Sequence, residues 1–247
     1  MGLKDDKTDV EIAQTATIGV GAYYGARAAG RKTGRYVTRN MVNPGKDLEL
    51  STRDIKKVYA TLKADKKDIR VKSVLDPTSR VPAPHYNPET NTAHIRNTAD
   101  AAHELGHATS ILNPKNKSLR LFSAKITAGI GHHNAGHIRG ATGFLRGLEG
   151  KDNDSGDYSL ADNFARVATG LGMFEEGQAS VRGYNALRKV KGSEFANLSA
   201  KKILIPAYAT YVANAAINHF AIPRIGNAFG QAVRKIKEEL IPKTSKK

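Results

Sequence analysis

The first clear pattern of apolar and polar positions lies at residues 51–64, STRDIKKVYATLKA. Its apolar residues recur at helical spacing and fall on one face: Ile55, Val58, Tyr59 and Leu62. Ser51 opens the stretch, and Asp54 follows three positions later at the spacing of a capping box. The pattern predicts a helix that begins just after Ser51.

Patterns typical of strands follow directly. The stretch IRVKSV at 69–74 alternates with a period of two, which predicts a strand. In APHYNPETNTAHIRN, two short extended arms at about 83–87 and 92–96 flank the turn-forming residues NPETN. We therefore expect a hairpin in this part of the chain.

The remaining patterns are mostly helical. Asn97 predicts an N-cap, with Asp100 three positions on, and Pro114 predicts the end of that helix. A further helix is predicted through FEEGQASVRGYNALRKV at 174–190, after a polar loop at 149–158. The fold class that we expect is α+β, predominantly α-helical, with a small sheet or hairpin beside the helix that starts near Asn97.

Two stretches carry no charge, at 12–26 and at 203–223. The second, ILIPAYATYVANAAINHFAIP, has the length of a membrane span, which needs about 20 residues. Its Pro206, Asn214 and His219 are unfavourable in hydrocarbon, as is Asn218. We favour a buried, Ala-rich core helix and keep a membrane span as the alternative.

The chain divides into four segments. We expect an Ala/Gly-rich helical segment at 1–45, a core at 46–195, an apolar helical segment at 196–233 packed on the core or on a membrane, and a disordered basic tail at 234–247. Hydrophobic residues make up 40% and charged residues 25% of the 247 positions, which indicates a folded protein. Because the chain has no cysteine, any metal site must use histidine and carboxylates.

The formal net charge of +16 predicts attraction to an anionic partner, either a membrane surface or nucleic acid. Simple solubility is the alternative explanation, because the sign of the charge does not identify a partner. No aromatic residues are interleaved with the basic runs as in a nucleic-acid recognition motif. The N-terminus, MGLKDDK, lacks the order of residues of a signal peptide, so we expect a cytoplasmic or membrane-associated protein.

The strongest chemical signal is HELGH at 103–107. Residues four apart lie on one helical face, so His103 and His107 can bind one zinc ion through their imidazole nitrogens. Glu104 lies beside the metal, where it can take a proton from the activated water and pass it to a leaving amine. Gly106 leaves room beside the second histidine although a glycine within a helix costs about 1 kcal/mol.

A catalytic zinc needs a third protein ligand. The downstream carboxylates are Glu149, Asp152, Asp154, Asp157, Asp162, Glu175 and Glu176. Glu176 is the best choice, because small residues follow it at helical spacing, as a tightly packed helix requires: Ala179, Ser180 and Gly183. Glu175 is the rival.

HELGH followed by EGQAS resembles the gluzincin metallopeptidases of the HtpX and YugP-like group, whose signature is HExxH plus a distant E-x-x-A-[DS]. The resemblance covers about residues 84–112 and 174–188 and implies that Glu176, rather than Glu175, is the third ligand. It also implies a zincin-like core and a strand near 92–96 that is the edge for an extended substrate peptide. Ser180 stands where many relatives carry Asp.

Further candidates lie near these motifs. Ser180, Arg182 and Tyr184, within and just after EGQAS, are candidates for an oxyanion or second-shell role, although surface packing explains Arg182 and Tyr184 as well. His132, His133 and His137 could supply an oxyanion donor or hold a second metal, but polar surface histidines are the simpler explanation.

The function that we expect is that of a zinc-dependent endopeptidase acting on a peptide or protein substrate. The alternative is a non-catalytic basic protein that docks on a membrane or on nucleic acid and has a structural or vestigial zinc site. The +16 charge favours the alternative, whereas the glutamate inside HELGH favours the enzyme.

Overall fold

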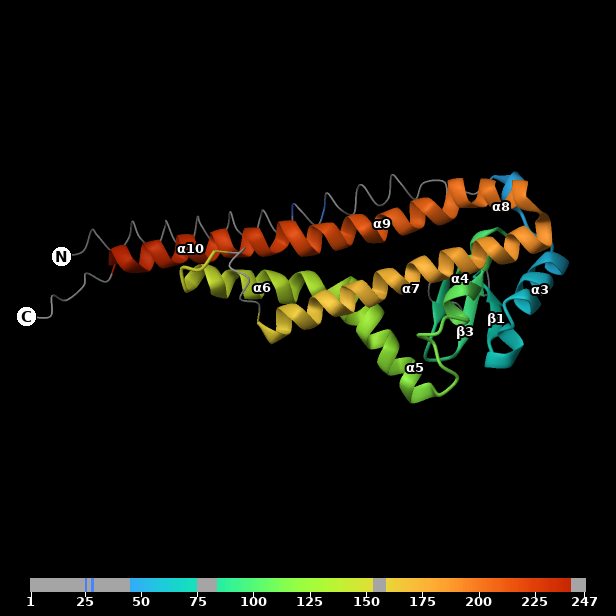
Figure 1. Cartoon of the computed structure of the whole chain (residues 1–247), viewed down its shortest axis with the longest axis horizontal. Helices are drawn as coiled ribbons and strands as arrows, with labels where there is room; N and C mark the ends of the chain where they lie inside the picture. The colour runs from blue at the N-terminus through green and yellow to red at the C-terminus, as the bar shows by residue number, and fades with distance from the viewer. Residues whose placement is uncertain (1–24, 26–27, 29–44, 75–83, 153–158, 241–247) are drawn as a thin grey trace, which may run out of the picture.

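The computed structural model describes residues 25, 28, 45–74, 84–152 and 159–240 (Figure 1). It is mostly helical with one three-stranded sheet, which confirms the expected α+β, predominantly helical class. The first elements are η1 (Lys46–Leu48), α3 (Thr52–Thr61), η2 (Ala64–Lys67), β1 (Arg70–Ser73), β2 (His85–Asn87), β3 (Thr92–Ile95), α4 (Asp100–Ala108) and α5 (Lys117–Ala124). They are followed by η3 (Lys125–Asn134), α6 (Ala135–Leu148), α7 (Leu160–Lys191), α8 (Ser193–Ser199), η4 (Ala200–Leu204), α9 (Ile205–Ala216), η5 (Ile217–Ala221) and α10 (Ile222–Leu240).

Helix α3 begins as the sequence predicts. The Ser51 hydroxyl accepts a hydrogen bond from the Asp54 backbone N–H at 3.1 Å, and the Asp54 carboxylate accepts one from the Ser51 N–H at 3.2 Å. This reciprocal capping box satisfies two N–H groups that the first turn would otherwise leave without partners. Ile55 and Val58 are buried on the face that the periodicity predicts.

The sheet has the strand order β1-β3-β2. β1 is parallel to β3, with Arg70 opposite Thr92, and β2 is antiparallel to β3, with Tyr86 opposite Ala93. The predicted strand and hairpin are therefore confirmed. The expectation that 92–96 forms an edge is wrong, because β3 is the central strand and β2 is the edge on its hairpin side.

Helix α4 starts later and ends earlier than the sequence predicts. Ala99, not Asn97, occupies the N-cap position, and it makes no side-chain cap. The Asn97 carbonyl instead accepts a hydrogen bond from the Leu50 N–H at 2.9 Å, so a tertiary contact uses this residue. The helix ends at Ala108, six residues before Pro114, where the Thr109 hydroxyl donates to the Leu105 carbonyl at 2.8 Å.

The long helix α7 is followed by a helical run from α8 to α10 that returns in the opposite direction; α8 and α9 of this run lie beside α7, whereas α10 packs along α6 (Figure 1). Gly192 joins them with φ of 92°, a left-handed conformation that favours glycine. Within the returning run, the π-helical segments η4 and η5 each end two residues before a proline, Pro206 and Pro223. A proline ring displaces the carbonyl of the preceding turn, which explains a local π-helical turn there.

The C-terminal part differs from the expected basic tail, since α10 continues from Ile222 as far as Leu240. Residues 203–223 are not wholly buried either: Ile203 is inaccessible, whereas Ile205 and Phe220 are 64% and 63% exposed. Among the described residues, no helix combines the length and the apolar character that crossing a bilayer requires. The expected helical segment at 1–45 lies almost entirely outside the described residues, as do most of 149–158 and the end of the tail.

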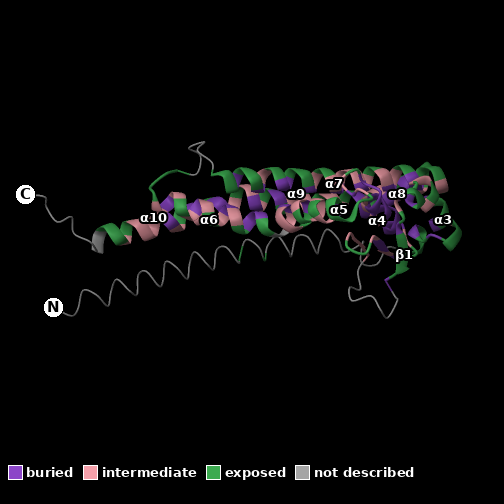
Figure 2. Cartoon of the chain, turned by 90° about the horizontal axis from the view of Figure 1, so that it is seen from below, coloured by how far each residue is buried: buried purple, intermediate pink, exposed green. Residues whose placement is uncertain are grey.

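Buried residues gather where α3, α4, α7 and α8 meet the sheet (Figure 2). This core includes Leu48, Val58, Leu105, Leu187 and Ile203, all with no exposed surface. The α4 helix that carries HELGH is thus anchored in the hydrophobic core. Its rigid placement matters because a metal site requires its ligands to be held before the ion binds.

Candidate metal centre

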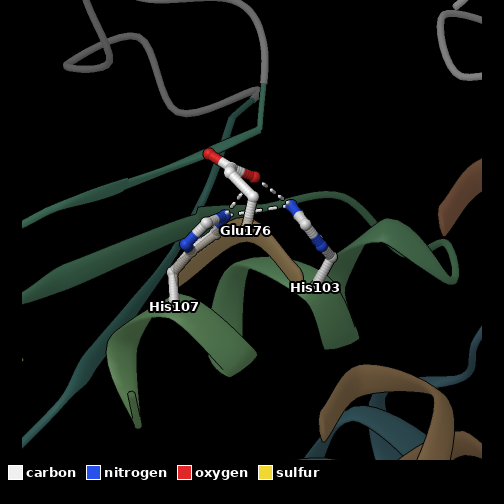
Figure 3. Close-up of side chains that lie close together, drawn as sticks. All are labelled: His103, His107 and Glu176. Atoms are coloured by element: carbon white, nitrogen blue, oxygen red, sulfur yellow. Dashed lines mark hydrogen bonds and ion pairs between the residues drawn. The ribbon is translucent and has the colours of Figure 1, made fainter. Parts of the chain in front are cut away.

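The two histidines of HELGH lie on one face of α4. His103 Nε2 and His107 Nε2 are 3.0 Å apart, and the ring planes are nearly perpendicular, at 86° (Figure 3). The spacing of four residues places one ring a turn above the other, so both nitrogens point to the same place. This part of the expected geometry is present.

Glu176 reaches the two histidines from α7 (Figure 3). Its Oε2 atom lies 3.4 Å from His103 Nε2 and 3.3 Å from His107 Nε2. The three residues form the group of potential metal ligands that the described part of the chain contains. Of the two rival glutamates, the structure therefore places Glu176 at the Nε2 nitrogens of both histidines.

A close crossing of α4 and α7 brings these residues together. A Cβ atom on Gly106 would lie 3.0 Å from Ala179 Cα and would overlap the Ala179 carbonyl, and one on Gly183 would lie 2.9 Å from the Ala102 carbonyl oxygen. Two glycines, one on each helix, thus allow backbone to approach backbone. Gly106 does leave room, as the sequence suggests, and α7 fills that room.

The other ring nitrogens also have partners from α7. His107 Nδ1 lies 2.7 Å from Glu175 Oε1, and His103 Nδ1 lies 3.3 Å from the Ser180 hydroxyl. Because a carboxylate only accepts hydrogen bonds, the Glu175 contact puts the proton of a neutral His107 on Nδ1 and leaves a lone pair on Nε2. Glu175 thus orients His107, and the Ser180 hydroxyl, which can donate or accept, contacts His103.

The donor set fits a zinc ion. Ligands at about 2.0–2.1 Å from a tetrahedral ion are separated from one another by about 3.3 Å, and the three distances here are 3.0, 3.3 and 3.4 Å. Glu176 Oε2 is buried and makes no hydrogen bond. A buried carboxylate oxygen facing two imidazole lone pairs is unfavourable unless a positive charge lies between them.

The pKa values of the ligands lead to the same conclusion. Burial opposes a charge on His107, but the Glu176 and Glu175 carboxylates raise its pKa well above the ordinary value. Burial also opposes the charge on Glu176, yet His107 and His103 hold the pKa of that carboxyl below its usual range. The site therefore stabilises a positive charge at its centre, which a divalent cation provides better than a proton.

Glu104 lines a cavity of about 230 Å³ together with the three ligands. Burial raises the pKa of Glu104, although His103 and His107 oppose this effect. A raised pKa brings a carboxylate closer to the neutral range in which a general base and acid must exchange protons. The residue next to His103 thus has the position and the environment that proton transfer requires.

Tyr211 of α9 completes this cavity and was not identified from the sequence. Burial, together with Glu176 and Glu104, raises its pKa well above the ordinary value. The hydroxyl therefore stays protonated and is a hydrogen-bond donor. No local pattern in the uncharged 203–223 segment distinguishes Tyr211, because only the folding back of α9 onto α7 brings it here.

His132 is the member of the histidine cluster that approaches the site. Its Nε2 lies 3.8 Å from Glu176 Oε1, and its ring centre is 4.7 Å from that of Tyr211. His137 is exposed, and the side chain of His133 lies outside the description. A second metal site at HHNAGH finds no support among the described residues. The group of potential metal ligands found in them consists of His103, His107 and Glu176 and includes none of these three histidines.

Arg182 and Tyr184 do not line the cavity. The Arg182 guanidinium donates to the Thr109 carbonyl just after α4, and the Tyr184 hydroxyl donates to Asn197 at 2.8 Å. Both side chains join helices outside the metal centre, which removes them as oxyanion donors in this arrangement. These contacts fit the alternative explanation, in which Arg182 and Tyr184 serve in packing.

The edge strand β2 forms one wall of the cavity through His85 and Tyr86. Arg120 of α5, which is buried, donates from Nε to the Pro88 carbonyl at 2.7 Å and from Nη1 to the Lys115 carbonyl at 2.9 Å. These bonds tie the hairpin turn to the segment before α5. The cavity is therefore framed by the hairpin, α4, α5 with η3, and α7 with α9.

Comparisons with protein-family models, with curated proteins and with solved structures found no match to this chain. The resemblance of HELGH and EGQAS to gluzincin metallopeptidases stays a prediction that rests on those two motifs.

Proposed function

We propose that this chain is a zinc-dependent endopeptidase. His103, His107 and Glu176 hold the ion, and Glu104 is the general base and then the general acid. The observation that carries the proposal is the convergence of two imidazole nitrogens and one buried carboxylate oxygen, 3.0–3.4 Å apart, in the wall of a cavity that also contains Glu104.

The protein residues have distinct tasks in such a reaction. When bound, zinc supplies an activated water at neutral pH and polarises the peptide carbonyl. Glu104 accepts a proton from the attacking water and donates it to the amide nitrogen as the peptide bond breaks. The Tyr211 hydroxyl, which stays protonated, donates a hydrogen bond to the oxygen on which negative charge develops.

The position of β2 suggests how a substrate peptide lies. An extended peptide can add to a sheet edge through backbone hydrogen bonds, with alternate side chains entering pockets. β2 is the edge strand that also lines the cavity, so a peptide paired with it would pass the metal ligands. This arrangement favours cleavage within a chain over removal of single terminal residues.

Zinc content and hydrolysis, measured on the same variants, test the proposal. We expect wild type to bind one zinc ion per chain and to hydrolyse an unfolded protein such as casein. Glu104→Gln should keep the zinc and lose at least about 100-fold in hydrolysis, because it cannot transfer the proton. Glu176→Ala should lose both, since it removes a ligand.

Two outcomes would contradict the proposal. Undiminished hydrolysis by Glu104→Gln removes Glu104 from the mechanism, and full zinc stoichiometry in Glu176→Ala overturns the ligand assignment. Wild type that binds zinc firmly but hydrolyses no peptide, and that instead binds DNA or anionic vesicles in a strongly salt-dependent manner, would favour the non-catalytic docking protein.

A further inference from the structure

Helix α7 exposes a row of large apolar side chains, and green stretches recur along it in Figure 2. Their exposed fractions run from 36% for Leu171 to 87% for Leu160. The row consists of Leu160, Phe164, Val167, Leu171, Phe174 and Val181. With Gln178, which lies in line with them, these seven positions are called the α7 seam. Large exposed apolar patches mark sites of interaction in soluble proteins.

The α7 seam has the spacing of a coiled coil. Its members, from Leu160 to Val181, are alternately four and three positions apart. A row with this mean period of 3.5 residues can face one neighbouring helix along its whole length. The seam covers three heptads, or about 32 Å of helix. Its period therefore fits a second helix lying along α7.

The composition of the seam fits the same partner. Gln178 is its only polar residue, and one polar residue in such a row is typical of helix pairs whose register it helps to set. Exposed positions beside the seam are uncharged, namely Ala161, Asn163 and Gly170. A helix that lies on a lipid surface instead carries lysine and arginine on its polar face. A Cβ atom on Gly170 would meet nothing within 4 Å, so another helix has room to approach there.

The area of the seam is sufficient for a dimer. The exposed fractions of its six apolar residues amount to more than three whole side chains. At about 200 Å² for each whole side chain, this is about 600 Å² per copy. Two copies would bury about 1,200 Å², whereas specific interfaces need about 1,000 Å² in total.

We propose that the α7 seam binds the α7 seam of a second copy of this chain, as an antiparallel pair of helices about a two-fold axis. Such an interface uses the same surface on both copies, and the seam is long and regular enough to cover itself. Arg188 and Lys189 are exposed at the C-terminal end of α7. A parallel pair would bring these charges together, whereas an antiparallel pair separates them by most of the helix length. This surface is independent of the proposed peptidase activity.

Sedimentation equilibrium of the full chain tests the proposal. We expect wild type to be a dimer at about 20 μM, because interfaces of this size have micromolar or tighter affinity. Val167→Glu and Leu171→Lys should each weaken dimerisation about 100-fold or more, since each puts unpaired charges into the interface. Leu119→Glu, on α5 and 58% exposed, is the matched control and should dimerise like wild type.

Mixing the two charged variants separates an interface from a folding defect. An antiparallel pair centred between Val167 and Leu171 places these two positions opposite one another, from different copies. An equimolar mixture of Val167→Glu and Leu171→Lys should therefore regain dimers through one pair of opposite charges. Far-ultraviolet circular dichroism and urea unfolding of each variant should match wild type, because both positions are exposed in the single chain.

Four outcomes would overturn the proposal. The first is a wild type that stays monomeric at about 100 μM, a concentration well above the expected dissociation constant. The second is a dimer that Val167→Glu leaves intact, and the third is equal dissociation by Val167→Glu and Leu119→Glu. The fourth is a monomer that binds phosphatidylglycerol vesicles and loses this binding in Val167→Glu, which would assign the seam to a lipid surface. Absence of dimers in the mixture would overturn the antiparallel orientation.

Discussion

At the scale of the residue, two adjacent glutamates of α7 have different partners. Glu176 faces the Nε2 atoms of both histidines, whereas Glu175 contacts only the Nδ1 atom of His107, at 2.7 Å. Hydrogen bonds of this kind fix the orientation of a ligand histidine and increase its basicity. Glu175 therefore belongs to the proposed metal centre although it is not one of the three proposed ligands.

Glu175→Gln should weaken zinc binding about 10- to 100-fold, because the amide oxygen can still accept from His107 but carries no charge. Competition with a chelator of known affinity measures the change at pH 7.5. Glu194→Gln, on an exposed position of α8, is the matched control and should bind zinc like wild type. Unchanged affinity in Glu175→Gln would mean that this contact does not tune the ligand.

Tyr211→Phe should lower kcat about 100- to 1000-fold with little change in zinc content, because it deletes one donor to the developing oxyanion. The two measurements are peptide hydrolysis and metal analysis of the same preparation. Tyr208→Phe, one turn earlier on α9 and outside the cavity, should leave kcat unchanged. If both variants lose activity equally, the effect comes from the packing of α9 rather than from the Tyr211 hydroxyl.

At the scale of the element, the crossing of α4 and α7 determines whether the ligands meet. Gly106→Ala places a Cβ atom against the Ala179 backbone, which cannot move as a flexible side chain would. We expect a loss of about 1–3 kcal/mol in the free energy of unfolding, as for overpacked interiors, and weaker zinc binding as α7 is pushed away.

Gly170→Ala is the control for Gly106→Ala. Gly170 lies within α7, and a Cβ atom there meets nothing within 4 Å. Alanine is the better helix former, so this variant should gain about 0.5–1 kcal/mol and bind zinc normally. Urea unfolding and zinc titration measure both variants. A Gly106→Ala protein as stable as wild type would show that the helix crossing tolerates the added methyl group.

What the sequence predicts correctly here is local. The capping box of α3, the hairpin and the pairing of His103 with His107 depend on residues three to five positions apart, whose relative placement helix and strand geometry fix. The choice between Glu175 and Glu176 depends on the rotation of α7 about its axis, which periodicity alone does not give. Asn97 failed as a cap because a tertiary contact with Leu50 uses its carbonyl.

The residues that only the fold reveals come from distant segments. Tyr211 and Arg120 reach the cavity from α9 and α5, and neither belongs to a short motif with HELGH. β3 has the alternation of any strand, so its central position became visible only with the parallel pairing to β1. The periodicity of a sequence indicates which face of a helix or strand is buried. Which elements lie next to one another depends on the long-range packing of the core.

At the scale of the whole molecule, α7 runs from α6 to the candidate metal centre, and its first turn carries the buried ion pair between Asp162 and Arg139 of α6. Burial alone would raise the pKa of Asp162, but hydrogen bonds from Arg139 and Arg166 lower it below the ordinary value. The carboxylate therefore stays ionised in the folded protein at pH values where it takes up a proton in the unfolded chain.

The sign of the pH dependence follows from this direction. Because the folded pKa is the lower one, the stabilisation by Asp162 is complete above about pH 5 and is lost as the pH falls below about 4, the usual carboxyl range.

Asp162→Asn leaves Arg139 buried without its counterion, which costs about 3–5 kcal/mol at neutral pH. The difference between wild type and Asp162→Asn should therefore be constant from pH 7 to 5 and shrink towards pH 3. Urea unfolding at each pH measures it, with Asp65→Asn at an exposed position as the control. A difference that stays the same down to pH 3 would show that the charge of Asp162 does not stabilise this end of the molecule.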